Sequence, residues 1–67
     1  MNKAPRYMRE YASTIKKSAE AYKKRLNHVN DDIWNETIKS AEKIIRTFEN
    51  GLITDREAMR MLAELPY

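Results

Sequence analysis

Glycine and proline occur at only three positions in this chain of 67 residues, namely Pro5, Gly51 and Pro66. Both residue types interrupt regular secondary structure, so their scarcity favours long helices over turn-rich or sheet folds. No stretch alternates apolar and polar residues over the length of a strand. We therefore predict an all-α fold in one domain, residues 1–67, with three helices at about 5–26, 31–49 and 55–65. The helices would form a small bundle, or a helical hairpin plus a third helix, that dimerisation could complete.

The first predicted helix begins at Pro5, because proline is well tolerated in the first helical turn. Asn27 can adopt the left-handed conformation that ends a helix. At 100° per residue, the apolar side chains of this segment fall within one arc of about 140°, which indicates an amphipathic helix. The residues of this arc are Tyr7, Met8, Tyr11, Ala12, Ile15, Ala19, Tyr22 and Leu26.

The second predicted helix has an N-cap at Asn30, followed by Asp31 and Asp32, whose charges suit the N-terminal end of the helix dipole. Val29 and Trp34 flank this cap at the spacing of a hydrophobic staple. Asn50 and Gly51 form a strong stop signal. The inward face is predicted to contain Ile33, Trp34, Ile38, Ala41, Ile44, Ile45 and Phe48.

The third predicted helix follows the sequence Thr54-Asp55-Arg56-Glu57, which matches a capping box. In this motif the threonine and glutamate side chains each bind a backbone N–H group at the start of the helix. Pro66 ends the helix. The residues predicted to point inward are Ala58, Met61, Leu62 and Leu65, with Met59 at the margin.

Aromatic and methionine side chains on the apolar helix faces are candidates for a protein interface, since such residues are enriched where proteins meet. For Met8 and Trp34, packing inside the molecule is the simpler interpretation. The first helix, at about 22 residues, is about 33 Å long and exceeds the third, so one end of it needs a cover. A second copy of the chain would supply one. The interface candidates are Tyr7, Met8, Tyr11, Trp34 and Met59.

Charge is distributed unevenly along the chain. Residues 1–30 contain eight basic and two acidic residues, and residues 31–67 contain five basic and eight acidic residues. A basic helix could bind the phosphates of nucleic acid or an anionic surface. The simpler interpretation, which we favour, is a solvated helix face with cations near its C-terminal end. The nucleic-acid candidates are Lys16, Lys17, Lys23, Lys24 and Arg25.

Several classes of function have little support in the sequence. The chain has no cysteine and one histidine, so neither a thiolate site nor a His-based catalytic centre is predicted. A short helical chain offers little concavity for a catalytic site. We therefore expect a non-enzymatic protein without metal, cofactor or small-molecule substrate. The longest apolar run is three residues, Met61–Ala63, and no signal peptide is predicted, so we expect a cytoplasmic protein without a membrane span.

The segment from Ala41 to Leu65 resembles the helical hairpin of the short C-terminal domain family. The resemblance rests on the turn Gly51-Leu52-Ile53-Thr54 followed by Glu57, while Ala58 departs from the aromatic residue common there. It covers under half of the chain and implies an oligomerisation or tethering role. Independently of it, we expect a small regulator or adaptor that binds another protein through an amphipathic helix face. Short, cysteine-free chains rich in lysine and isoleucine are common among small regulators and accessory proteins of bacteria and their phages, so we expect such an origin.

Overall fold

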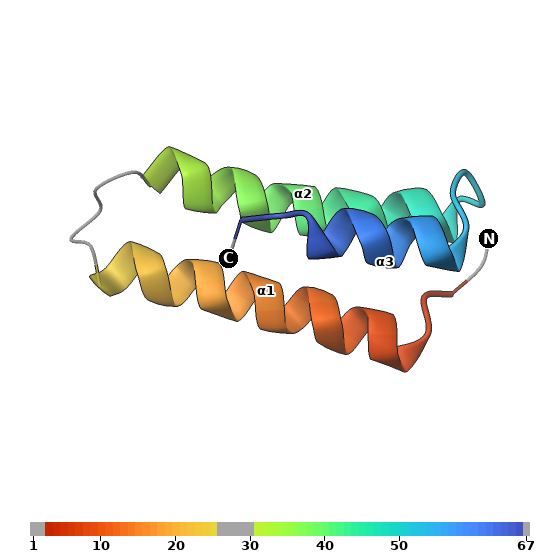
Figure 1. Ribbon diagram of the computed structural model, residues 1–67, viewed down its shortest axis with the longest axis horizontal. Helices are drawn as coiled ribbons and strands as arrows, with labels where there is room; N and C mark the ends of the chain where they lie inside the picture. Colours follow the sequence, from red (N-terminus) through yellow and green to blue (C-terminus); the bar gives the residue numbers. More distant parts are fainter. Residues whose placement is uncertain (1–2, 26–30, 67) are drawn as a thin grey trace.

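The computed structural model describes residues 3–25 and 31–66, which form three α-helices (Figure 1). Helix α1 spans Arg6–Arg25, α2 spans Asp31–Glu49 and α3 spans Asp55–Ala63. The predicted all-α class and the order of the helices are confirmed. The predicted cap at Asn30, the stop at Asn27 and the staple from Val29 to Trp34 lie outside the described residues, as does Leu26.

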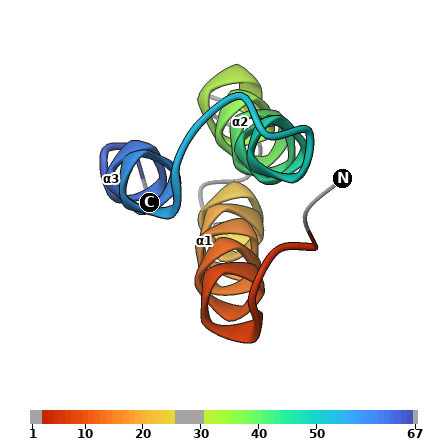
Figure 2. The same cartoon turned by 90° about the vertical axis from the view of Figure 1, so that its right-hand side faces the viewer.

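Helices α1 and α2 form a long antiparallel pair, and α3 lies against one side of it, parallel to α1 (Figures 1 and 2). The molecule measures 39 × 18 × 17 Å. Because α3 has only 9 residues against 20 in α1, it covers the N-terminal half of α1 and the C-terminal half of α2. The other half of the pair extends beyond α3, and the opposite side of the pair has no third helix (Figure 2).

Small side chains let the backbones of α1 and α2 approach each other closely. Ala12 and Ala19 of α1 and Ala41 of α2 are at most 3% exposed. Met8, Ile15 and Leu62 are the largest fully buried apolar side chains. The buried cluster consists of Ala4, Met8, Ala12, Ile15, Ala41, Ile44, Ala58 and Leu62.

The end of α2 is a Schellman motif centred on Gly51, as the glycine predicts. The Gly51 N–H donates to the carbonyl oxygen of Phe48 (2.9 Å), and the Leu52 N–H donates to that of Thr47 (3.1 Å). Gly51 has a φ of 77°, a conformation that side chains with a Cβ rarely adopt. Two carbonyl groups at the end of α2 thereby gain partners, and the chain reverses toward α3.

The predicted capping box at the start of α3 is confirmed. The Glu57 N–H donates to the Thr54 hydroxyl oxygen (3.1 Å), and the Thr54 N–H donates to Oε1 of Glu57 (3.2 Å). Helix α3 ends at Ala63, two residues before the predicted end. A proline disfavours helical dihedrals at the residue before it, so Pro66 excludes Leu65 from the helix.

The N-terminal end of α1 receives its anionic partners from the other helices. Its first turn has no acidic residue, although the helix dipole favours anions there. Instead, the Ala4 N–H donates to Oε2 of Glu49 (3.0 Å), and the Tyr7 hydroxyl donates to Oδ2 of Asp55. Both carboxylates come from positions more than forty residues away in the sequence.

Three apolar residues predicted to lie on inward faces are exposed instead: Tyr7 is 52%, Ile33 48% and Met61 38% exposed. Conversely, Thr37 is only 1% exposed although it was not predicted to be inward. Its hydroxyl lies 3.1 Å from the carbonyl oxygen of Ile33 and 3.0 Å from that of Pro66, and its single hydrogen serves one of them at a time. The contact surface of α2 is therefore rotated toward Thr37 relative to the predicted face.

Candidate binding surfaces

Three of the predicted interface residues lie along the seam between α1 and α3. The hydrogen bond from Tyr7 to Asp55 fixes the alignment of the two helices at one point. Because α1 and α3 run parallel, Tyr11 and Met59, each four residues further along, come next on the same seam. Tyr11 and Met59 are half-buried against the core. Tyr7 is thus the most exposed of the three predicted residues.

Met8 and Trp34 are placed elsewhere. Met8 is fully buried and has no surface to offer a partner. Trp34 stacks on Tyr22 near the end of the α1–α2 pair, with ring centroids 4.9 Å apart and planes at 17°. Its indole Nε1 is buried and has no hydrogen-bond partner among the described residues. The Trp34 ring is therefore committed largely to packing between α1 and α2.

A shallow groove of about 360 Å³ runs between α2 and α3. Ile44 and Leu65 contribute apolar surface to it, and Met61 lies beside them with 38% of its surface exposed. Lys43 and Glu64 add charges of opposite sign. The full lining is Ser40, Lys43, Ile44, Thr47, Met61, Glu64 and Leu65.

An exposed apolar residue, Ile33, lies on the same side of α2 as this groove, beyond the buried Thr37. Ile33, Thr37, Ser40 and Ile44 follow one another at spacings of four, three and four residues, so they lie on the same side of α2. Ile33 is 48% exposed at the end of this row. We call Ile33, Ile44, Met61 and Leu65 the α2–α3 strip. Sequence reasoning assigned all four residues to the core. The assignment is confirmed for Ile44, which is 5% exposed, and for Leu65, which packs against the core, and it is wrong for Ile33 and Met61.

Three of the five predicted basic residues line the side of the α1–α2 pair that α3 does not cover. Two neighbouring hollows lie there, and no residue of α3 lines either of them. The first hollow is lined by Arg9, Ala12, Lys16, Glu42, Ile45 and Arg46. The second is lined by Glu20, Lys23, Lys24, Asn35 and Ile38.

Of the five predicted nucleic-acid candidates, the structure groups Lys16, Lys23 and Lys24 on this side. Lys17 lies beside a separate hollow on α1, together with Glu20 and Lys24. The side chain of Arg25 lies outside the described residues. Sequence reasoning left Arg9 and Arg46 out of the candidate set. Arg9 could have been found from its spacing of seven residues from Lys16, whereas Arg46 joins only through the packing of α2 on α1.

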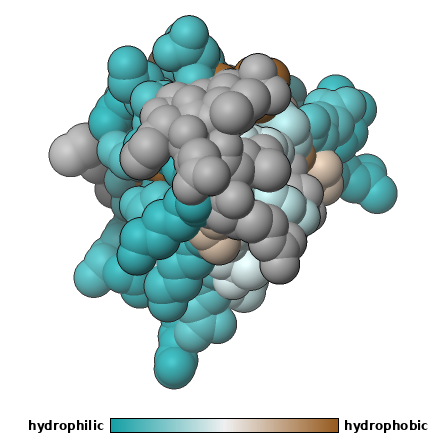
Figure 3. Space-filling view, turned by 90° about the vertical axis from the view of Figure 1, so that its left-hand side faces the viewer, coloured by the Kyte–Doolittle hydropathy of each residue, from teal (hydrophilic) through white to brown (hydrophobic). Residues whose placement is uncertain are grey.

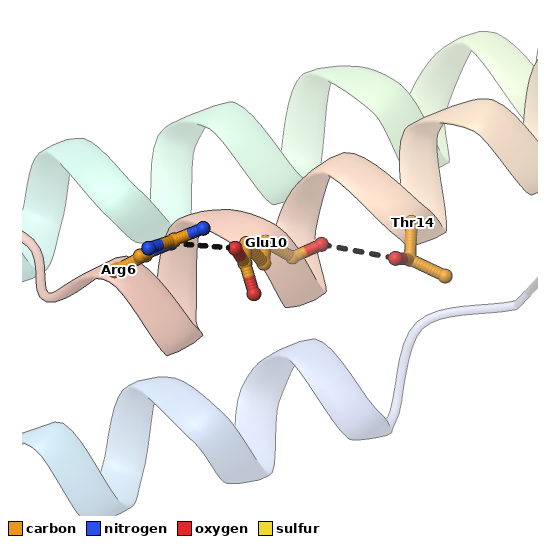
Figure 4. A network of polar contacts seen from close by, with 3 residues as sticks. All are labelled: Arg6, Glu10 and Thr14. Atoms are coloured by element: carbon orange, nitrogen blue, oxygen red, sulfur yellow. Dashed lines mark hydrogen bonds and ion pairs between the residues drawn. The ribbon is translucent and has the colours of Figure 1, made fainter.

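The N-terminal half of α1 has an exposed polar face on which the cation of Arg6 is paired with the carboxylate of Glu10 (Figure 4). Nε of Arg6 donates to Oε1 of Glu10 at 2.8 Å, and the Thr14 hydroxyl donates to the Glu10 carbonyl oxygen at 3.0 Å. An exposed pair spaced by four residues contributes about 0.3–0.5 kcal/mol. Arg6 is therefore a surface residue with a local partner rather than a member of the basic side.

The described residues contain no cluster of three or more histidine or acidic side chains that could hold a metal ion. No described helix is long and apolar enough to cross a membrane. Viewed from the end of the α1–α2 pair, the described surface is mostly hydrophilic, with small hydrophobic areas (Figure 3).

Comparison with protein-family models, with curated proteins and with solved structures finds no match for this chain. The resemblance to the short C-terminal domain family therefore stays a similarity of one turn motif.

Proposed function

We propose that this protein is a small, non-enzymatic adaptor or regulator in the cytoplasm that binds a partner protein through the α2–α3 strip. The observation that supports this proposal is the exposure of Met61 in a groove whose lining includes Ile44 and Leu65, with the exposed Ile33 further along the same side of α2. An apolar centre with charged residues at its edge, here Lys43, is typical of protein interfaces.

The shape of the strip favours a helical partner. A groove between two helices accepts the apolar face of a third helix, whose side chains at spacings of three and four residues fill it. Helix α3 is short, so the end of the strip at Ile33 extends beyond it along α2. A second copy of this chain is the simplest such partner, because the same strip on both copies can form a symmetric contact.

A double substitution in the strip tests this proposal. Ile33→Ser and Met61→Ser together remove the two exposed apolar side chains without changing charge. The control is Leu52→Ser, since Leu52 is, among the described residues, the most exposed large apolar one, at 74%, and lies outside the strip. Each variant is used to capture proteins from a nuclease-treated lysate of the native host, and its mass in solution is measured by light scattering at micromolar concentration.

We expect the wild type and the Leu52→Ser variant to retain the same specific partner, or to form the same dimer, and the strip variant to lose it. Circular dichroism verifies that the strip variant is folded. A strict monomer that captures the same proteins with and without the strip substitutions would contradict the proposal.

A further inference from the structure

A row of cations runs along the side of α1 that α3 leaves uncovered. Arg9, Lys16 and Lys23 recur every seven residues, which places them on nearly the same side of the helix. At 1.5 Å per residue, successive members are about 10.5 Å apart and the row is about 21 Å long. Arg46 of α2 lines the same hollow as Arg9 and Lys16. We call these four residues the cation row.

The charge of this side is not cancelled by its carboxylates. Five cations line the two hollows, the cation row together with Lys24, against the two acidic residues Glu20 and Glu42. The ion pair within 4.0 Å among the described side chains is the one between Arg6 and Glu10, on another face of α1. Lys23 donates to a neutral partner, Oδ1 of Asn35, at 2.9 Å. The positive charges of the row are therefore not neutralised by any described carboxylate within 4.0 Å.

We propose that the cation row binds the phosphate backbone of a DNA duplex without sequence preference. Lysine and arginine side chains are the usual partners of phosphate groups, and such contacts supply affinity without reading bases. A spacing of about 10.5 Å is close to the width of the B-DNA major groove, about 12 Å. Neighbouring cations of the row can therefore reach phosphates on the two sides of a groove.

The absence of aromatic side chains from the lining of the two hollows favours a duplex over a single strand. Proteins that bind single strands stack the bases on aromatic rings. Here Tyr22 and Trp34 stack on each other instead. The two described hollows therefore offer charge for a backbone and no ring for an unpaired base.

The test measures the affinity of the protein for a 20-base-pair DNA duplex and for a single strand of equal length at several salt concentrations. Fluorescence anisotropy of the labelled probe reports binding. Each phosphate contact contributes a slope of about −0.9 to the plot of log K against log [salt]. Four contacts predict a slope of about −3.6 for the duplex, which is about a 150-fold loss of affinity between 50 and 200 mM salt.

The matched variants have equal net charge. Arg9→Gln, Lys16→Gln and Lys23→Gln remove three members of the row, whereas Lys43→Gln, Arg56→Gln and Arg60→Gln remove three exposed cations elsewhere. We expect the first triple variant to flatten the slope by about 2.7 and the second to leave it nearly unchanged. The Ile33→Ser, Met61→Ser variant should bind the duplex like the wild type, which separates this proposal from the proposed protein partner.

Three outcomes would overturn the assignment. They are the absence of any duplex complex at 50 mM salt, an equal effect of the two triple variants, and tighter binding of the single strand than of the duplex. All six substituted side chains are exposed or half-buried, and circular dichroism of each triple variant establishes that its helices are intact.

Discussion

Replacement of Leu62 by alanine is expected to remove most of the stability of this protein. Leu62 is fully buried, and with Ala58 it is one of the two buried residues of α3. A helix of 9 residues is too short to persist alone, since isolated helices below about 12–15 residues are marginal in water. The position of α3 therefore depends on the burial of this side chain against α1 and α2.

The expected loss can be estimated from the burial. Truncation of a buried leucine to alanine costs about 2–5 kcal/mol, because apolar contact is lost and a cavity remains. A single core of this size supplies about 3–5 kcal/mol in total. A loss of about 3 from about 4 kcal/mol leaves about 1 kcal/mol, at which about one molecule in six is unfolded at 25 °C.

The free energy of unfolding is measured by urea titration. Far-ultraviolet circular dichroism and the fluorescence of Trp34 monitor the unfolding. Leu52→Ala is the matched control, because it makes the same chemical change at a residue that is 74% exposed. We expect the control to lie within about 0.5 kcal/mol of the wild type. A loss below about 1 kcal/mol in Leu62→Ala, or a comparable loss in Leu52→Ala, would refute the reasoning.

Three further substitutions test the turns and the buried hydroxyl, each by the same urea titration. Gly51→Ala should lower the free energy of unfolding by about 1–2 kcal/mol because of the φ of 77° alone, since an added Cβ meets nothing within 4 Å. Asparagine tolerates this conformation better, so an equal loss in Gly51→Asn would argue against this cause. Thr54→Ala should cost about 1 kcal/mol by removing the cap, whereas Thr54→Ser should stay near the wild type. Thr37→Val should cost about 1 kcal/mol because the Pro66 carbonyl loses its donor, and a neutral result would show that this hydrogen bond contributes nothing.

The helices and the turn between α2 and α3 were predictable because their signals are local. Gly51 sets a backbone conformation, and Thr54 and Glu57 bind backbone groups at the start of their own helix. The early end of α3 was missed, although Pro66 contained the information. Local signals of this kind act within a few residues, so they need no knowledge of the packing.

The candidate surfaces were predictable only in part. The sequence pointed to Tyr7, Tyr11 and Met59, which the structure brings to one seam, and to Lys16, Lys23 and Lys24, which it brings to one side. The role of Arg46 depends on how α2 lies against α1. The exposure of Ile33 and Met61 in the α2–α3 strip was missed because both residues were assigned to the core.

The amino-acid sequence by itself determined that the chain forms three helices, where two of them are capped, and which broad face of each is apolar. Only the tertiary structure decided which residues within those faces are covered. A helical period defines an arc more than 100° wide, whereas a neighbouring helix covers only the part nearest its own axis. Thr37 is buried where the chain after α3 reaches it at Pro66, whereas Ile33, one turn further along α2, is exposed.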